Sequence, residues 1–301
     1  MARVIVVGSI NQDVTVTVDR FPSPGETLSG SSLTYGLGGK GANQAAAAAH
    51  SGAETLFVGA VGTDLSGQRL RDELASHGVD VTHLRAVDGP SGTALVTVAA
   101  SGENTIILDA GANAAVTTEP AKASLIPASS DVVVLQAEVP AEANAAAIEW
   151  AHSHGARVLL NLAPARDTAP ATLAQVDVLV VNETEAGLTL GLPAPATPTE
   201  AIGIARALRG MGPRHIVVTL GAQGAAWVSG AEVGHCPTVT LGEVVDTTGE
   251  GDACVGALAA ALTLGMPFAE AVAAGMRAGA TAVLTPGAAS SYAALPQITE
   301  G

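Results

Sequence analysis

The sequence predicts an α/β fold in which a mostly parallel sheet carries helices on both faces and a small antiparallel β-sheet stands beside it as a lid. Short runs of β-branched residues, such as Val4–Val7, alternate with Ala-rich segments of helical composition. Continuous apolar strands are typical of a sheet covered on both faces, and strand–helix alternation implies parallel strands joined by right-handed crossovers. Four other segments alternate with period two and have no helix between them, which predicts a separate sheet with one solvated face.

The main sheet and its helices follow from apolar runs and Ala-rich stretches taken in chain order. Each expected strand is short and rich in Val, Leu or Ile, and each expected helix is rich in Ala and Leu, which are strong helix formers. The expected strands are Val4–Val7, Leu56–Ala60, Val132–Gln136, Val158–Asn161, Val178–Val181, Ile216–Leu220 and Ala225–Val228, and the expected helices are Gln68–His77, Ala141–His154, one that starts near Glu250, and Ala269–Leu284.

The lid is expected from four strands that come from two parts of the chain. The segment Ala100–Asn104 contains a glycine between two period-two runs and predicts a β-hairpin. The four strands are Val14–Val18, Leu28–Tyr35, Thr93–Ala99 and Thr105–Leu108. We expect residues 1–301 to form one domain, with the lid inserted at about 14–38 and 91–110.

The composition predicts a chain with a large core and narrows the possible partners. Of 301 residues, 48% are apolar and only 14% are charged, a balance that disfavours disorder. Aromatic residues make up 2%, so the core must consist of Ala, Val and Leu. The net charge of −15 and the lack of any basic run argue against nucleic acid or an anionic membrane as partner.

The first residues and the two cysteines indicate a soluble cytoplasmic protein. The apolar run near Met1 is too brief for the core of a signal peptide or for a membrane span. Cys236 and Cys254 lie far apart and match no metal or redox spacing, so we expect buried free thiols in a reducing cytosol.

The stretch Asp246–Leu264 predicts an anion pocket at a helix start. Gly249 and Gly251 precede an Ala/Leu-rich segment, so backbone N–H groups of the first helical turn are open to a close ligand. Asp252 lies in that same turn, where a phosphoryl-transfer site would place a base beside N–H donors. The alternative is a plain helix start, because Thr247 and Glu250 have the spacing of a capping box.

A second glycine-rich stretch, Gly36–Asn43, predicts a loop that wraps around a small polar ligand. It fits G-x-G-x-x-G formally, but it does not follow the first parallel strand, and no Ser or Thr follows Lys40 as a P-loop requires. Asn11 and Asp13 follow the first strand, where ligands gather in open α/β sheets, and their side chains suit sugar hydroxyls. An Asx turn is the alternative for these two residues.

Polar residues end two other expected strands. Glu138 follows the strand Val132–Gln136, and Asn182 and Glu185 follow the strand Val178–Val181. An Asn followed three residues later by Glu is suited to a metal–phosphate group, and it also matches a helix N-cap with its capping acid.

With these residues in view, the chain resembles the ribokinases of the PfkB sugar-kinase family over nearly its whole length. No single motif is specific, but the combination is. The stretches that carry the resemblance are Gly8–Asp13, Phe21–Thr27, Gly38–Gln44, Ser101–Asn104, Gly111–Asn113, Leu162–Ala165, Asn182–Glu185, Thr219–Gly221 and Asp246–Asp252.

The resemblance implies a Rossmann-like, ribokinase-like domain with a β-sheet lid, which phosphorylates O5 of D-ribose with ATP and Mg²⁺, depends on K⁺ and forms a homodimer through the lid. It assigns Asp252 as the base and Gly249, Glu250 and Gly251 as the anion hole. The sugar would be held by Asn11, Asp13, Gly39, Lys40, Asn43, Glu138 and Asp252; ATP by Asn182, Thr219, Gly221, Gly224 and Gly251; Mg²⁺ by Glu185, through water; and K⁺ by Asp246, Thr248, Ala282, Thr285, Gly287 and Ser291.

Three departures from the family pattern leave alternatives open. Glu250 stands where a small residue is usual, Ala253–Val255 replaces Thr-Phe-Asn, and Leu162 replaces Pro. A carboxylate at Glu250 would repel ATP phosphates unless it points away or meets a cation. The alternatives are a kinase of the same family acting on deoxyribose, fructose or a nucleoside, and a sugar-binding protein that has lost catalysis.

Overall fold

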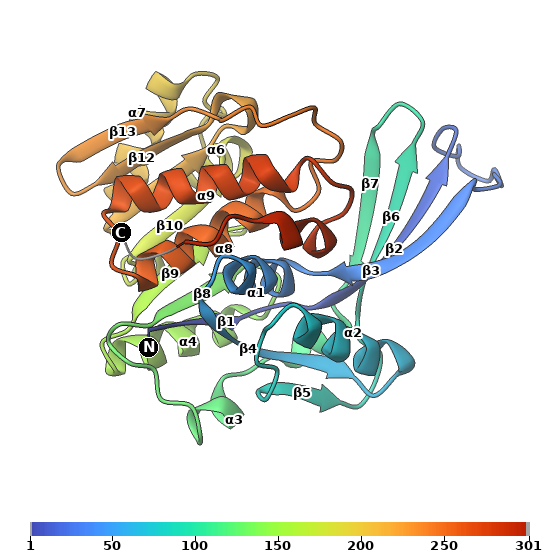
Figure 1. The fold of residues 1–301 in the computed structure, drawn as a ribbon, viewed down its shortest axis with the longest axis horizontal. Coiled ribbons are helices and arrows are strands. Elements are labelled where there is room, and N and C mark those ends of the chain that lie inside the picture. Colours follow the sequence, from blue (N-terminus) through green and yellow to red (C-terminus); the bar gives the residue numbers. More distant parts are fainter. Residues whose placement is uncertain (1, 299–301) are drawn as a thin grey trace.

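The computed structural model describes residues 2–298 and places a nine-stranded sheet at the centre of the molecule (Figure 1). The strand order is β13-β12-β11-β10-β9-β8-β1-β4-β5, and β12 is antiparallel to both neighbours while the other pairs are parallel. This confirms the predicted fold class. The strands are β1 (Arg3–Val7), β4 (Glu54–Gly62), β5 (Leu84–Val87), β8 (Val132–Gln136), β9 (Arg157–Asn161), β10 (Val178–Asn182), β11 (His215–Thr219), β12 (Ala225–Ser229) and β13 (Glu232–Cys236).

Helices cover both faces of this sheet, because successive strand residues point to opposite sides. Val4 and Val6 of β1 pack into one core with α1, α2, α8 and α9, whereas Ile5 and Val7 pack into a second core with α4, α6 and α7. The helices are α1 (Lys40–His50), α2 (Leu65–Ser76), α3 (Glu119–Lys122), α4 (Ala141–Ser153), α5 (Pro170–Leu173), α6 (Glu183–Leu190), α7 (Pro198–Arg209), α8 (Glu250–Thr263) and α9 (Phe268–Ala282), with 3-10 turns at Gly111–Ala115, Gly221–Gln223 and Ala289–Ala294.

The four-stranded lid projects from one end of the main sheet (Figure 1). Its strand order is β3-β2-β6-β7, and the expected hairpin joins β6 to β7. The sheet is mixed rather than purely antiparallel, because β2 and β6 pair in parallel. The third expected strand also begins later than predicted, at Ser32 instead of Leu28. The lid strands are β2 (Asn11–Val18), β3 (Ser32–Gly38), β6 (Gly92–Ala99) and β7 (Asn104–Asp109).

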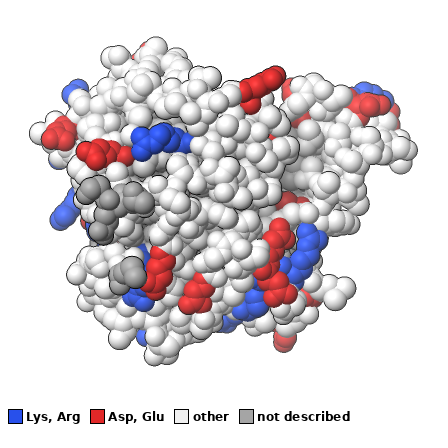
Figure 2. Space-filling view, viewed as in Figure 1, with Lys and Arg blue, Asp and Glu red and all other residues white. Residues whose placement is uncertain are grey.

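Surface charge is sparse. Figure 2 shows a face on which most of the described surface is uncharged and Lys and Arg are few. Within residues 2–298, no helix combines the length and the apolar character that crossing a membrane requires. Cys254 is a buried free thiol, as expected, whereas Cys236 is free but partly exposed rather than buried.

Close packing of α1 against α8 depends on Gly256. A Cβ atom at this position would lie 2.5 Å from the backbone oxygen of Gln44 and 2.6 Å from the Cβ of Ala47. Only glycine therefore lets the two helices approach this closely, and the approach brings the start of α1 beside the start of α8.

We predict that Gly256→Ala destabilises the protein by about 1–3 kcal/mol, as overpacking of a core typically does. Gly203 of α7 is a matched control, because a Cβ there would meet nothing within 4 Å. Gly203→Ala should instead stabilise the protein by up to about 1 kcal/mol through helix propensity. Urea unfolding of both variants measures the difference, and equal effects would contradict this account of the helix contact.

Candidate active site

The first turn of α8 presents backbone N–H groups without a side-chain cap. Gly249 adopts the left-handed conformation, with φ of 77°, and no side chain hydrogen-bonds to the helix start. The capping box expected as an alternative from Thr247 and Glu250 does not form. Among the described residues, the N–H groups of Gly249 and Gly251 have no hydrogen-bond partner, whereas that of Glu250 donates to the oxygen of Thr247 at 3.3 Å.

The loop packs closely against Tyr292 at Gly249 and is open at Gly251. A Cβ on Gly249 would lie 2.5 Å from the Oη of Tyr292, which is buried and donates a 2.8 Å hydrogen bond to the oxygen of Gly249. A Cβ on Gly251 would meet nothing within 4 Å. The helix dipole adds partial positive charge at this end, so the turn is suited to an anion.

Asp252 lies beside the glycine-rich loop near residue 40, as predicted. Its carboxylate is 8% exposed and accepts two hydrogen bonds from α1. The Nδ2 of Asn43 donates to Oδ2 at 3.1 Å, and the Nε2 of Gln44 donates to Oδ1 at 2.8 Å. The Oδ1 of Asn43 is buried and has no protein partner in residues 2–298, which leaves an acceptor for a ligand.

The glycine loop itself is shaped by close backbone contacts. Gly39 has φ of 88°, and a Cβ there would lie 2.9 Å from the N of Asn11. The Oε2 of Glu138 accepts hydrogen bonds from the N of Lys40 at 3.0 Å and from the Oγ of Ser9 at 2.6 Å. The loop, β1 and the end of β8 therefore meet at one point, as the sequence predicted.

Several carboxylates surround Lys40. Burial opposes its charge, but Asp252, Glu138 and Glu185 together raise the pKa of Lys40 above its ordinary value. Asp13 belongs to the same group: burial, followed by the charges of Glu138 and Asp252, raises its pKa to about 7. Lys40 therefore stays positive in the middle of an acidic site.

Asn11 is in β2 and not in an Asx turn, so that alternative is wrong. Its Oδ1 accepts a 2.7 Å hydrogen bond from the Nδ2 of Asn113, which also donates to the oxygen of Ile10. The Oδ1 of Asn113 accepts from the N of Ile10 at 2.9 Å. Asn113 thus fixes the chain where the main sheet passes into the lid.

Asn182 and Glu185 form a capping box at the start of α6, so the helix-cap interpretation of this pair is confirmed. Each side chain accepts a hydrogen bond from the backbone N–H of the other residue, at 2.7 and 2.9 Å. Burial raises the pKa of Glu185 above its ordinary value, although the hydrogen bond with the backbone of Asn182 and the positive charge of Lys40 partly offset this effect. Glu185 therefore faces the same site as Lys40 and Asp252, in addition to capping its helix.

The turn after β11 has the tight shape predicted for it. The N of Leu220 donates to the oxygen of Gly224 at 2.8 Å, and Gly221 and Gly224 have φ of 50° and 88°. The Oγ1 of Thr219 lies 3.5 Å from the oxygen of Val181, which joins the turn to β10. The turn follows the carboxyl end of β11. Asn182 ends the neighbouring parallel strand β10, so the turn and Asn182 lie at adjacent strand ends.

The expected cation loop is partly assembled. Asp246 accepts hydrogen bonds from the N of Thr248 at 2.9 Å and from the N of Gly287 at 2.8 Å, so these three residues lie together. The N of Thr285 bonds to the oxygen of Ala282 at 3.4 Å. Ser291 is buried and donates to the oxygen of Ala288, and no hydrogen bond within residues 2–298 joins it to Asp246.

Glu250 points away from the open side of the turn. The Cγ of Glu250 packs against α9: a Cβ atom added to Gly279 would lie 3.3 Å from it. Burial, and then the charge of Glu183, raises the pKa of Glu250. The side chain is therefore directed along the α8–α9 contact, and its backbone N–H remains at the helix start.

Residues 1–295 match the sequence profile of the pfkB family carbohydrate kinases. The chain belongs to this family. It is similar to the ribokinase of Haemophilus influenzae, with 36% identity over 95% of this chain and 94% of that protein, and to the deoxyribokinase of Salmonella typhi, with 34% identity over 99% and 97%. It is also similar to the structure of Arabidopsis thaliana ribokinase complexed with ribose and ATP, with a TM-score of 0.89, 31% identity and coverage of 99% and 96%.

Several residues of this PfkB-family site were missed by the sequence analysis. They are buried polar side chains that hold the predicted ones: Ser9, Gln44, Asn113, Gln136, Asn161 and Tyr292. A signal existed for most of them. Ser9, Gln44 and Asn113 lie in the motif stretches Gly8–Asp13, Gly38–Gln44 and Gly111–Asn113. Gln136 and Asn161 end apolar strands at the edge of the sheet where Glu138 also lies.

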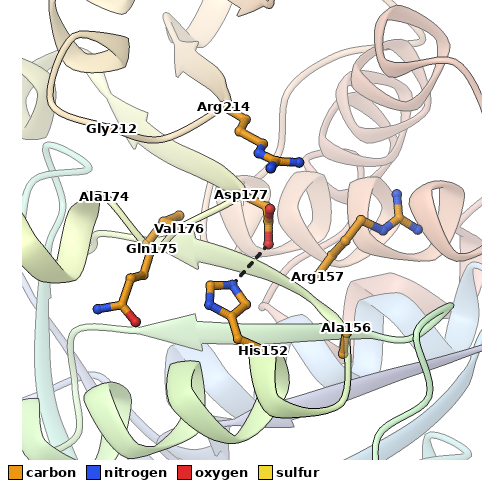
Figure 3. Close-up of a pocket in the computed structure, with 10 residues that line it drawn as sticks. His152, Ala156, Arg157, Ala174, Gln175, Val176, Asp177, Gly212 and Arg214 are labelled. Carbon is orange, nitrogen blue, oxygen red and sulfur yellow. Dashed lines mark ion pairs between the residues drawn. The ribbon is translucent and has the colours of Figure 1, made fainter.

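A separate cavity of about 390 Å³ lies at the opposite ends of β9, β10 and β11 and contains none of the predicted site residues. Figure 3 shows His152 directed at Asp177, to which it is paired at 3.5 Å, while Arg157 points away. Asp177 also accepts a hydrogen bond from the N of Val158 at 2.9 Å. The side chains of His152 and Asp177 therefore have protein partners in this cavity.

Proposed function

We propose that this PfkB-family sugar kinase transfers the γ-phosphoryl group of ATP to O5 of D-ribose and yields ribose 5-phosphate. The observation that carries the proposal is the position of Asp252, in a helix turn with open N–H groups and beside the loop of Lys40 and Asn43. A relative whose structure is described as complexed with ribose and ATP, together with relatives named ribokinase, supports ribose as the acceptor.

In this mechanism the sugar hydroxyls bind to short polar side chains around the glycine loop. Asn11, Asp13 and Glu138 offer acceptors, Lys40 offers a charged donor, and the unpartnered Oδ1 of Asn43 offers a further acceptor. Gly39 lets the sugar approach the backbone closely. These groups would hold O5 next to the carboxylate of Asp252.

Asp252 then accepts the proton of the O5 hydroxyl while O5 attacks the γ-phosphorus in line. The O5–phosphorus bond forms, the bond to the bridging oxygen breaks, and ADP leaves. The unpartnered N–H groups of Gly249 and Gly251 would face the charge that spreads over the migrating phosphoryl, and the N–H of Glu250 would join them on giving up its 3.3 Å bond to the oxygen of Thr247. Asn182 and the turn with Thr219, Gly221 and Gly224 would hold ATP, since they lie at neighbouring strand ends.

Two cations fit the residues present. Glu185 would hold Mg²⁺ through water, and this ion would balance charge on the ATP phosphates.

The Asp246 loop offers oxygen donors only, which suits a hard cation such as K⁺. Asp246, Thr248, Ala282, Thr285, Gly287 and Ser291 would hold it, and its role would be to fix the shape of the α8 loop.

The test is ADP release with a panel of acceptors, with and without K⁺. We expect ribose to give the highest kcat/KM and K⁺ to raise turnover. The 34% identical deoxyribokinase makes 2-deoxyribose the second candidate, and a preference for it would replace ribose in the proposal. Fructose and a nucleoside complete the panel. Sugar binding by calorimetry without ADP release would favour a catalytically inactive binding protein instead.

We further propose that two copies pair through their lids. Strand β7 is exposed along its whole length, and the lid exposes large apolar side chains. A cluster of exposed apolar side chains of this kind is typical of an interface. The exposed residues are Leu33, Tyr35, Leu95, Ile106, Ile107 and Leu108.

Ile107→Lys should therefore convert a dimer into a monomer in sedimentation velocity, because it places a charge in the apolar contact. Leu188→Lys, which changes an exposed residue of α6, is the control and should leave the dimer intact. A wild-type protein that sediments as a monomer at high concentration contradicts the lid contact.

A further inference from the structure

Gln44 of α1 joins Asp252 to a chain of buried amides. The side chain of Gln44 is fully buried. Its amide nitrogen donates two hydrogen bonds and its amide oxygen accepts one. Its Nε2 donates to the Oδ1 of Asp252 at 2.8 Å and to the Oδ1 of Asn161 at 2.9 Å. Its Oε1 accepts from the Nε2 of Gln136 at 2.7 Å.

The backbone oxygen of Val180 can only accept hydrogen bonds, and this determines which atom donates in each bond of the amide network. The Nδ2 of Asn161 donates to the oxygen of Val180 at 3.1 Å, so the Oδ1 of Asn161 must face Gln44. Gln44 must then present its nitrogen to both Asn161 and Asp252, and its oxygen to Gln136. The two donors of one amide nitrogen are both used, so Gln44 cannot turn over without losing bonds.

The elements around Gln44 hold it in this orientation. Asn161 ends β9 and Gln136 ends β8, so two neighbouring strands of the main sheet contact the same amide. On the other side, Gly256 permits the close crossing of α1 and α8 that brings Gln44 within reach of Asp252. Asp252 is thereby connected to the rigid centre of the sheet, although it lies at a helix start.

We propose that Gln44 is a positioning residue for the reaction: it fixes Oδ1 of Asp252, so that Oδ2, which also accepts from the Nδ2 of Asn43, faces the acceptor hydroxyl. This role rests on the proposed function of Asp252 as the base. Catalytic groups need a fixed geometry, and a carboxylate free to rotate spends less time aligned with the attacking oxygen. Gln44 does not itself touch the sugar or ATP in this account.

The competing explanation is that the amide chain only satisfies buried polar groups in the core. Gln44→Met separates the two, because Met has a similar length and can pack without hydrogen bonds. We expect kcat to fall about 10- to 100-fold, as loss of a hydrogen bond to a charged group would give, while the KM values for sugar and ATP change less than about threefold. A core role alone would lower the melting temperature without this split.

A double-mutant cycle provides the decisive readout. If Gln44 acts through Asp252, then adding Gln44→Met to Asp252→Ala should leave the residual single-turnover rate unchanged within about twofold. If Gln44 has a catalytic role of its own, the rate should fall by a similar factor in both backgrounds, and this result would overturn the proposal.

Two more variants keep the test decisive should Gln44→Met fold poorly. Gln136→Met removes the partner that holds the oxygen of Gln44 and leaves the bond to Asp252, so kcat should fall less, by about two- to tenfold. Ser51→Ala is the control, since Ser51 is buried at the end of the same helix and its hydroxyl has no partner among the described residues. It should keep wild-type kcat. Full kcat in Gln136→Met would count against the proposal.

Failure of the function and failure of this role give different results. A wild-type protein that releases no ADP with any sugar of the panel overturns the function and this role with it. An active wild type together with an equally active, folded Gln44→Met overturns the role of Gln44 alone.

Discussion

Asp252→Asn is expected to lower kcat at least about 100-fold, while sugar binding stays within a few fold of wild type. An amide cannot accept the O5 proton, and general-base catalysis typically contributes about 10²–10⁴-fold. The fold should tolerate the change. Gln44 keeps its acceptor at Oδ1, so one of the two hydrogen bonds that α1 makes to this side chain remains.

Three measurements define this result. Coupled ADP release gives kcat, calorimetry gives sugar affinity, and thermal melting by circular dichroism verifies folding. Asp177→Asn is the matched control, because the same chemical change is made beside the cavity at the opposite strand ends. It should keep wild-type kcat. Turnover of Asp252→Asn within about threefold of wild type would remove Asp252 from the mechanism.

Asp13→Asn is expected to raise the KM for the sugar about 10- to 100-fold at pH 8.5. Hydrogen bonds to a charged group contribute about 1.5–3 kcal/mol, which corresponds to this range. Burial and the charges of Glu138 and Asp252 raise the pKa of Asp13 to about 7. In the wild type, the sugar KM should therefore fall as pH rises through about 7 and the carboxylate forms. Asp13→Asn should lose this dependence.

The same pKa makes a prediction about stability. The folded-state pKa of Asp13, about 7, lies above the ordinary value of 3.8, so the folded protein binds this proton more tightly than the unfolded chain. The contribution of Asp13 to stability therefore falls as pH rises from about 4 to about 7, and the cost of the buried charge is complete above that range. Asp13→Asn removes this cost.

Relative to wild type, the free energy of unfolding of Asp13→Asn should therefore be larger (a more stable protein) at pH 8 than at pH 5. Urea unfolding without ligand at both pH values measures it. Asp19→Asn, at an exposed residue just after the same strand, serves as the control. A variant whose relative stability is the same at both pH values would show that Asp13 does not titrate as described.

The parts of the fold that could be predicted are those with one dominant signal. Val4–Val7 and Val132–Gln136 were predicted as strands because a short continuous run rich in β-branched residues is typical of a strand buried on both faces, and the structure confirms both. The hairpin around Ala100–Asn104 was equally clear. The parallel pairing of β2 with β6 was not predictable from local patterns, because period-two alternation indicates a half-covered strand but not the direction of its partner.

The candidate site shows the same division. The glycines and charged residues near residues 40 and 250 come from short motifs, and the structure brings them together. Gln44 lies in the stretch Gly38–Gln44, and Gln136 and Asn161 end apolar strands, but their roles could not be predicted because they depend on contacts between elements. For Asn182 and Glu185 one spacing fits two roles, and only the structure shows that the capping box is present.

The most direct test of the central claim is a crystal structure of the protein with ADP, a planar phosphoryl mimic such as aluminium fluoride, and ribose. We predict that the mimic lies at the start of α8, with its ligand atoms about 3 Å from backbone N–H groups of the Gly249–Gly251 turn. We also predict that a carboxylate oxygen of Asp252 lies about 2.6–3.2 Å from O5 of the sugar. A mimic bound away from that turn, or an O5 out of reach of Asp252, would contradict the account.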